Sequence, residues 1–322
     1  MSNTELFPII SLSYLAFEYV SGRKNKDQFH SDPTIISLAK EIKNAFMEWG
    51  FVYFVDHGIG KDVIQKAFET SKAFFELDST VKQNFKWYND NKENFGWVPF
   101  KIETVENTRP FDLKECFNFL PDTVREYEIN QRLPTFMRSQ RALLCSCQLL
   151  SEFILRLITL ALPVGDMDFL NTKHTFKDPE LNASIARLLY YPPIKSKENV
   201  LENQLRCGEH SDYGTFTFLF QDKVGGLQVL SPSGDYVDAT PVPDSVVVNI
   251  GDLLEIWSGG KFKSTRHRVV VPDDNTESAR QSIVYFVHPD NNVMVSCLNG
   301  SNKNVAVNSL EYLLDKYKQT YA

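Results

Sequence analysis

Residues 210–220, with the sequence HSDYGTFTFLF, decide the fold class of this chain. Thr215, Thr217 and Leu219 alternate with phenylalanines, which is the two-residue period of a β-strand with two different faces. Other short β-branched and aromatic runs, separated by Gly, Pro and Asp, occupy residues 185–191, 227–230, 246–250, 269–271 and 282–288. Their spacing predicts an antiparallel sandwich or jelly roll in the C-terminal half.

Helical patterns dominate the chain before that region. Asp32 and Pro33 are typical of a helix N-cap and first turn, and this helix is expected to end at Gly50. A short buried strand is predicted over 51–55, followed by a second amphipathic helix over 61–77. After a loop-rich middle, the helical pattern of 133–162 is expected to back the sheet.

The predicted fold is therefore mixed α/β (α+β), with a distorted double-stranded β-helix (jelly roll) core, a helical N-terminal part and a C-terminal helix. The C-terminal helix is predicted over 309–317, behind a serine cap. We divide the chain into an N-terminal helical and strand region (1–125), a backing helix and connector (126–180), the β core (181–290) and the C-terminal helix (291–322).

Composition narrows the function classes. The net charge of -7 is mild and mixed along the 322 residues, so nucleic acid is not an expected partner. The five cysteines form no Cys-x-x-Cys pair and are expected to be reduced thiols. The N-terminus lacks a signal-peptide pattern, and the apolar stretch 142–162 is interrupted by Glu152 and Arg156. We therefore expect a cytoplasmic protein without a membrane partner; its oligomeric state is not predicted.

The motif His-x-Asp occurs three times, at residues 30–32, 210–212 and 288–290. On a strand its two side chains share one face and can bind one metal ion. Asp32 is better explained as a helix cap, and Pro289 lies where a strand runs into a polar turn. The middle copy stands at the entrance of the β core, which makes His210 and Asp212 the candidate metal ligands.

A third ligand is needed, because two histidines and one carboxylate leave positions open on iron for other reactants. His57 lies in a turn and His174 in a polar loop, whereas His267 begins a strand-like run 55 positions after Asp212 (267 − 212). His267 is therefore the best candidate. Taken alone, each of the two proposed ligand histidines is better explained as an ordinary surface or interior residue.

Arg280 favours a metal site over these ordinary explanations of the two histidines. Arg280 and Ser282 lie two residues apart on a predicted strand, so their donors point to the same face, and no nearby acidic residue on that strand could neutralise the guanidinium. An unpaired guanidinium in a core is costly. We infer that the missing anion is a ligand from solution, and a dicarboxylate that also chelates iron fits.

Several motifs in order along the chain resemble those of the isopenicillin N synthase-like family of 2-oxoglutarate/iron(II) dioxygenases. The N-terminal segment is similar at residues 7–12, 48–51 and 56–59. The iron-binding domain is similar at 210–214, 225–229, 249–252 and 265–269. The similarity covers most of the chain.

The resemblance implies Fe(II) on His210, Asp212 and His267, and the far carboxylate of 2-oxoglutarate on Arg280 and Ser282. Tyr191 matches a tyrosine that often contacts this co-substrate. Many members carry Asn where this chain has Leu189, so one expected polar contact is missing. The spacing between His267 and Arg280 is longer than in many members, and the polar run 273–277 is expected to absorb the difference as a turn.

The implied activity is the oxidation, usually the hydroxylation, of a small-molecule metabolite with O₂ and 2-oxoglutarate, releasing succinate and CO₂. Alternatives are an iron oxidase of the same fold without 2-oxoglutarate, a zinc hydrolase, and a binding barrel without turnover. No His-Glu-x-x-His pattern supports the hydrolase. The sequence does not identify the substrate, whose pocket is expected to involve residues 95–119.

Two further residues match or adjoin family features. His57 is assigned a structural role, because histidines in turns commonly bond the local backbone. Trp97 is left open between lining a substrate pocket and ordinary packing.

Overall fold

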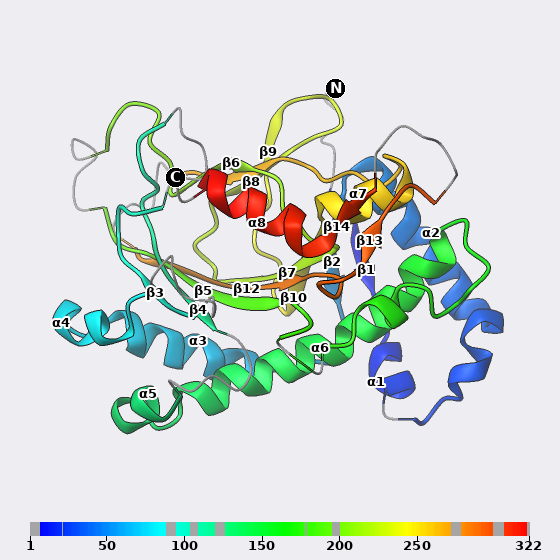
Figure 1. The fold of residues 1–322 in the computed structure, drawn as a ribbon, viewed down its shortest axis with the longest axis horizontal. Coiled ribbons are helices and arrows are strands. Elements are labelled where there is room, and N and C mark those ends of the chain that lie inside the picture. Colours follow the sequence, from blue (N-terminus) through cyan, green and yellow to red (C-terminus); the bar gives the residue numbers. More distant parts are fainter. Residues whose placement is uncertain are drawn as a thin grey trace.

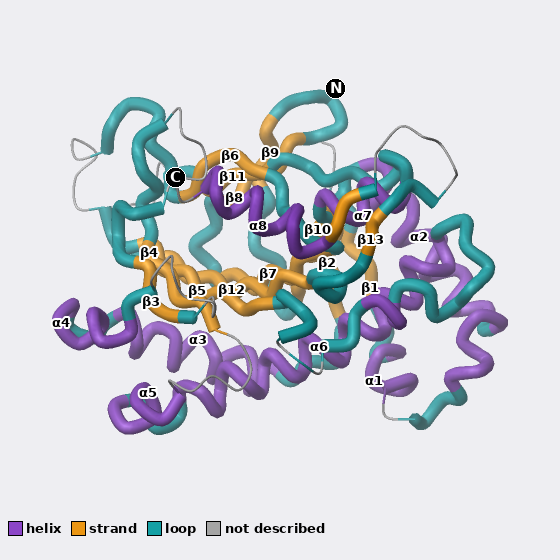
Figure 2. Tube along the Cα trace, in the orientation of Figure 1, coloured by secondary structure: helices purple, strands orange, loops and turns teal. Residues whose placement is uncertain are grey.

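In the computed structural model, two β-sheets face one another and helices cover the outer face of the larger sheet (Figures 1 and 2). The structure describes residues 7–20, 22–87, 95–103, 109–119, 126–176, 178, 180–194, 200–271, 278–298 and 306–320. The turn predicted over 273–277 lies outside the described residues, and the domain boundaries proposed from the sequence stay predictions.

The larger sheet has eight strands in this part of the chain, in the order β1-β2-β10-β7-β12-β5-β4-β3. Its neighbouring strands are antiparallel except for β1 and β2. The predicted strands 51–55 and 185–191 are confirmed to the residue. The strands are Ile9–Ser11 (β1), Phe51–Val55 (β2), Gly96–Val98 (β3), Glu115–Phe119 (β4), Ile185–Tyr191 (β5), Phe216–Gln221 (β7), Ser245–Ile250 (β10) and Arg280–Val287 (β12).

The smaller sheet has four described strands, all antiparallel, in the order β6-β11-β8-β9. They are Cys207–His210 (β6), Leu227–Leu230 (β8), Tyr236–Asp238 (β9) and His267–Val269 (β11). Together the two sheets form the predicted jelly-roll core. A separate hairpin pairs Met294–Val295 (β13) with Val307–Asn308 (β14).

The helices lie mostly on the outer face of the larger sheet, whereas α8 passes in front of the β core in the view of Figure 1. Helix α6 is the one described helix long and apolar enough to span a membrane, but 61% of its apolar 18-residue window is buried. It packs against α1, α2 and α3 and against strand β12 of the larger sheet. It is therefore the backing helix that was predicted. The helices are Leu15–Val20 (α1), Lys26–Ser31 (η1), Pro33–Glu48 (α2), Lys61–Phe75 (α3), Ser79–Lys82 (α4), Gln83–Phe85 (η2), Glu126–Arg132 (α5), Phe136–Ala161 (α6), Asn171–Lys173 (η3), Asp252–Ser258 (α7) and Ser309–Thr320 (α8).

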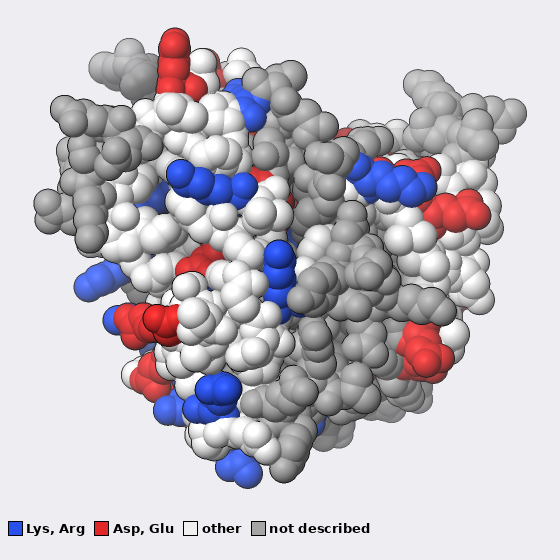
Figure 3. Space-filling view, turned by 60° about the vertical axis from the view of Figure 1, so that its left-hand side comes forward, with Lys and Arg blue, Asp and Glu red and all other residues white. Residues whose placement is uncertain are grey.

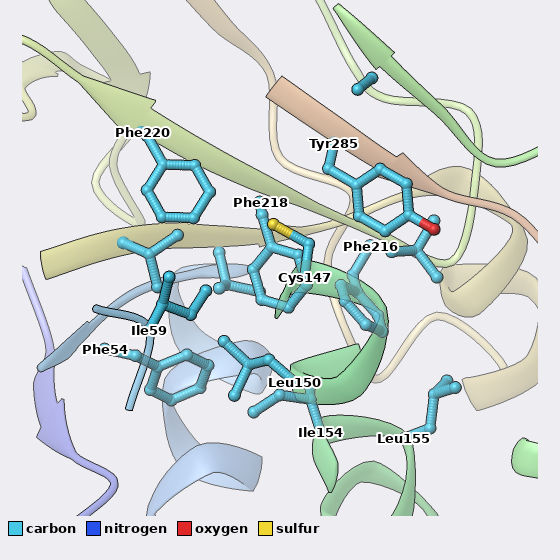
Figure 4. Close-up of a cluster of buried hydrophobic side chains, with 14 of the residues drawn as sticks. Phe54, Ile59, Cys147, Leu150, Ile154, Leu155, Phe216, Phe218, Phe220 and Tyr285 are labelled. Atoms are coloured by element: carbon cyan, nitrogen blue, oxygen red, sulfur yellow. The ribbon is translucent and has the colours of Figure 1, made fainter. Parts of the chain in front are cut away.

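Strand β7 separates the core from the interior of the β-helix. Phe216, Phe218 and Phe220 are buried in the cluster that includes Leu150 and Ile154 of α6 (Figure 4). The side chains between them, at 217 and 219, line a cavity on the other face. The alternation read from the sequence therefore divides structural from cavity-facing positions.

The middle of the chain contains two strands that the sequence analysis did not predict. Strands β3 and β4 extend the larger sheet, and Cys116 and Asn118 of β4 pair with Leu189 and Arg187 of β5. Strand β3 has only three residues, and β4 contains the polar residues Glu115 and Asn118, so neither forms a continuous apolar run of strand length in the sequence. The expectation of a loop-rich middle did not include these two strands.

Trp97 has an ordinary packing role in this structure. It is buried in the main hydrophobic cluster, and its Nε1 donates a 2.6 Å hydrogen bond to Glu115 Oε2.

Two local predictions are confirmed. Asp32 caps α2 by accepting a hydrogen bond from the Thr34 amide, and His57 Nδ1 accepts one from the Ile59 amide at 3.1 Å.

His174 lies in a loop after η3, as predicted, but its side chain is buried. Its Nδ1 lies 2.7 Å from the Leu170 carbonyl oxygen and its Nε2 lies 2.7 Å from Thr215 Oγ1. The imidazole thus ties the segment after α6 to the start of β7. Burial lowers the pKa of His174 to about 4.

The free energy of unfolding is expected to fall as the pH drops from about 6.5 to about 4, because the unfolded chain protonates His174 before the folded chain does. A folded-state pKa below the unfolded value gives stability that is present above pH 6.5 and lost below it. A shift of this size corresponds to roughly 3 kcal/mol, because each pKa unit is worth about 1.4 kcal/mol. Urea denaturation at several pH values measures this slope. His174→Gln should flatten it, and an unchanged slope in this variant would contradict the assignment.

Candidate functional site

The three predicted metal ligands come together from separate segments. His210 ends β6, Asp212 follows in the connection to β7, and His267 opens β11, where it pairs with His210. Each histidine Nε2 lies 3.8 Å from Asp212 Oδ1, and the three ligand atoms all lie within 4.8 Å of one another. Two metal bonds of about 2.1 Å span up to about 4.2 Å, so the 3.8 Å from Asp212 to each histidine suits a shared ion.

The hydrogen bonds of both histidines fix which nitrogen faces the ion. His210 Nδ1 lies 2.8 Å from the Gly208 carbonyl oxygen, and His267 Nδ1 lies 3.1 Å from that of Thr265. A carbonyl can only accept, so each Nδ1 carries the proton and each Nε2 presents a lone pair. Backbone carbonyls commonly orient metal-binding histidines in this way.

Asp212 is held as a carboxylate. Burial alone would raise the pKa of Asp212, but His267, His210, Thr217 and Asn249 outweigh it and keep the pKa below its ordinary value. Asn249 Nδ2 donates to Asp212 Oδ2 at 2.6 Å. Because β6 ends at His210, Asp212 is positioned by these contacts and not by sharing a strand face with His210, as the sequence argument assumed.

Two glycines, Gly214 and Gly251, allow the backbone that follows Asp212 to pack closely against neighbouring backbone. A Cβ on Gly214 would overlap the Val287 carbonyl oxygen, and one on Gly251 would overlap the Gly214 oxygen. The amides of Asp252 and Leu253 then donate to the carbonyls of Asp212 and Gly214, at 2.8 and 3.0 Å. These contacts fix the backbone that carries Asp212.

Gly251→Ala is expected to lower the free energy of unfolding by at least about 2 kcal/mol, because its Cβ would clash with backbone. Displacement of the loop should also weaken Fe(II) binding. Urea denaturation and an anaerobic Fe(II) titration measure the two effects. Gly165→Ala is the matched control, since a Cβ there meets nothing within 4 Å. Equal behaviour of the two variants would contradict this role for Gly251.

Arg280 lies on β12 beside the same interior space and is fully buried. Its Nη1 donates to Ser282 Oγ at 3.2 Å and its Nη2 to Gln221 Oε1 at 3.4 Å, and its guanidinium carbon lies 4.8 Å from the centre of the Tyr191 ring. Among the described residues, no carboxylate lies within ion-pair distance of Arg280. Its partners are all neutral, so the buried charge fits an anionic ligand.

One cavity between the two sheets is lined by all three predicted metal ligands and by Arg280, Ser282 and Tyr191. Leu189 also lines it, which makes the wall apolar at this position. The arrangement can therefore hold a metal ion and a dicarboxylate in one largely enclosed space.

Sequence reasoning missed a charged cluster on the cavity wall. Arg187 Nη1 lies 3.0 Å from Glu103 Oε1, and Lys114 Nζ lies 3.4 Å from Glu103 Oε1 and 2.5 Å from Asp112 Oδ2. Burial would raise the pKa of Glu103, but Arg187 and Lys114 lower it to about 2. The position of Arg187 could have been predicted, because Arg187 and Leu189 lie two residues apart on a correctly predicted strand and therefore share a face.

The two residues of the third His-x-Asp copy, His288 and Asp290, have different roles. Asp290 accepts hydrogen bonds from Thr175 and Asn182, which supports its structural explanation. His288, however, lines the cavity, and burial lowers the pKa of His288 to about 4. The two-residue period of the predicted strand 282–288 could have indicated this position, because it puts His288 on the same face as Arg280 and Ser282.

Comparisons with known proteins agree with this geometry. Residues 7–137 match the family described as non-haem dioxygenase in morphine synthesis N-terminal, and residues 182–289 match the 2OG-Fe(II) oxygenase superfamily. A homoarginine-6-hydroxylase of Glycine max is 32% identical over 292 residues, which cover 87% of this chain and 84% of that protein. The chain belongs to the 2OG-Fe(II) oxygenase superfamily.

Other 2OG-Fe(II) oxygenases are similar over nearly the full length. The 2-oxoglutarate-dependent dioxygenase gloF of Glarea lozoyensis is 28% identical and covers 98% of this chain and 99% of its own. A full-length Neurospora crassa protein, crystallised in complex with alpha-KG, which is 2-oxoglutarate, has a TM-score of 0.81 at 30% identity and covers 99% and 98% of the two chains. The protein is therefore an Fe(II)- and 2-oxoglutarate-dependent oxygenase, with O₂ as the usual co-substrate.

Proposed function

We propose that His210, Asp212 and His267 hold the iron of this oxygenase, and that Arg280 and Ser282, beside Tyr191, hold the far carboxylate of 2-oxoglutarate. One observation carries the proposal. Two histidine lone pairs and a carboxylate converge in the same cavity as a buried guanidinium whose partners are all neutral. A chelating dicarboxylate satisfies both ends of that cavity.

In this arrangement the protein orients its reactants and excludes water. Asp212 offsets part of the metal charge, while Arg280 fixes one end of 2-oxoglutarate and so sets which end reaches the metal. The bound iron supplies the chemistry with O₂ that protein side chains lack. The burial of both groups strengthens these electrostatic interactions.

The roles are tested by succinate release from the Fe(II)-loaded protein in the presence of O₂ and 2-oxoglutarate. We expect slow release without substrate and faster release with one. A compound that drives O₂ consumption without succinate would instead support the oxidase that needs no 2-oxoglutarate.

We propose further that the substrate is a small, uncharged polar molecule. In the cluster of Glu103, Asp112, Lys114 and Arg187, two cations compensate two carboxylates, so this wall carries little net charge to attract an ion. A charged substrate buried against it would lose its hydration without gaining a partner. The neighbouring lining is apolar or aromatic: Tyr213, Ile185, Leu219, Val284 and Phe286.

Two relatives provide contrasting probes. The Neurospora crassa protein also has a structure with alpha-KG and thymine, an uncharged base, whereas the Glycine max relative is named for homoarginine, a charged amino acid. In a metabolite panel that contains both, uncharged compounds such as thymine are expected to accelerate succinate release and charged ones are not. Acceleration by homoarginine alone would overturn the proposed class.

The surface supports a small-molecule partner. On the face that Figure 3 presents, the described Lys and Arg side chains are interspersed with Asp and Glu and form no extended basic area. Such mixing favours a metabolite over nucleic acid, whose backbone requires clustered positive charge. The cytoplasmic location stays a prediction, which cell fractionation would test.

A further inference from the structure

Arg206 has a buried charge that the proposed function does not use. It directly precedes β6, and 0% of the residue is exposed. Its Nη2 donates to the Ser278 carbonyl oxygen at 3.1 Å, while its Nε and Nη1 have no hydrogen-bond partner in the described part of the chain. Buried polar groups are nearly always paired, so these two nitrogens need an explanation.

The surroundings of Arg206 belong to the co-substrate end of the cavity. Ser278 lies two residues before Arg280, and Cys207, next to Arg206, lines the cavity. Burial, and then the positive charge of Arg280, lowers the pKa of Arg206, whereas Tyr191 and Asp222 act in the opposite direction. Arg206 is therefore electrostatically coupled to both Arg280 and Tyr191.

Two buried guanidinium groups thus act on the same end of the cavity. Within the described ranges, neither Arg206 nor Arg280 has a carboxylate at ion-pair distance, and the Nε of each lacks a hydrogen-bond partner. Two like charges destabilise one another in a medium of low dielectric constant. An anion bound near Arg280 would attract both guanidinium groups and so offset the repulsion between them.

We propose that Arg206 is a positioning residue of the 2-oxoglutarate site, where its charge reinforces Arg280 and selects 2-oxoacids that carry a second carboxylate. The inference rests on the proposed role of Arg280. Arg206 does not itself line the cavity, so it acts through the field at Arg280 and Tyr191. A purely structural arginine would instead contribute to the stability of the metal-free protein.

The test compares wild type, Arg206→Met and Arg206→Lys, with Arg268→Met as control, because Arg268 lies on β11 and pairs with Gln228 outside the site. Anaerobic calorimetry on Fe(II)-loaded protein measures binding of 2-oxoglutarate and of 2-oxobutyrate, which lacks the far carboxylate. We expect Arg206→Met to weaken 2-oxoglutarate binding about tenfold or more, with 2-oxobutyrate binding unchanged. Arg206→Lys, which keeps the charge, should lie between it and wild type.

Urea denaturation of the metal-free variants separates this role from a structural one. Loss of an uncompensated buried charge should leave Arg206→Met at least as stable as wild type. Unchanged 2-oxoglutarate affinity, or equal weakening for both 2-oxoacids, would overturn the inference. Reduced stability with normal affinity would also overturn it. If wild type itself fails to bind 2-oxoglutarate, the proposed function fails first, which is a different result.

Discussion

The Asp212→Ala variant is expected to bind Fe(II) more than about 100-fold more weakly than wild type and to release no measurable succinate. Loss of a residue that merely supports a metal ligand typically weakens metal binding about 10–100-fold, and Asp212 is proposed as a ligand itself. The variant would leave two neutral imidazoles without the negative charge that offsets the cation. Metal content after gel filtration and succinate release measure the two effects.

The other two His-x-Asp copies provide matched controls. Asp32→Ala removes the N-cap of α2 and should lower the free energy of unfolding by about 0.5 to 2 kcal/mol without affecting iron. Asp290→Ala removes the acceptor for Thr175 and Asn182, and should likewise affect stability and not iron binding. Retention of iron by Asp212→Ala would show that the geometry of the middle copy has been misinterpreted.

Arg280→Met is expected to weaken 2-oxoglutarate binding by a factor of about 30 to several thousand, with Fe(II) affinity unchanged. Removing one member of a buried charge pair costs about 2 to 5 kcal/mol, and about 1.4 kcal/mol corresponds to a factor of ten. The metal-free variant should be no less stable than wild type, because the guanidinium has only neutral partners before the co-substrate binds.

Calorimetry and urea denaturation measure both parts of this prediction, again with Arg268→Met as the control that removes an arginine elsewhere. A normal dissociation constant for 2-oxoglutarate in Arg280→Met would remove Arg280 from the site. A large loss of stability in the metal-free state would mean that Arg280 is mainly structural.

The sequence was most informative where one short segment carries both the pattern and its consequence. The alternation around β7 predicted a strand, and the structure places its phenylalanines against α6 and Thr217 in the cavity. Asp32 and His57 were also assigned correctly, because each bonds an amide two residues away. His210 and Asp212 were chosen by context among three copies of one motif, and His267 among the remaining histidines; the structure brings the three together.

Residues that depend on distant contacts could not be predicted in the same way. Asn249 supports Asp212 from 37 positions away, and Arg206 reaches Ser278 across 72 positions. His174 is the loop residue that the polar sequence predicted, but its burial and its contacts with Leu170 and Thr215 were not predicted. Such contacts are set by how the strands and connections pack, which a local period does not encode.

The charged wall shows the same limit. Glu103 and Lys114 lie in a segment that was expected to form loops, and they acquire a role only when Arg187 of β5 is brought beside them. The general position of the pocket could be anticipated, but its charge balance could not. The proposed substrate class therefore depends on the structure and not on the sequence pattern.

The most direct test of the central claim is an anaerobic titration of the metal-free protein with Fe(II) and then 2-oxoglutarate, monitored for the weak visible charge-transfer band of the chelate. We predict a saturable band that requires both components. In Arg280→Met, the same band should appear only at a much higher 2-oxoglutarate concentration. No band in wild type, with iron demonstrably bound, would contradict the proposed binding of 2-oxoglutarate to iron in this cavity.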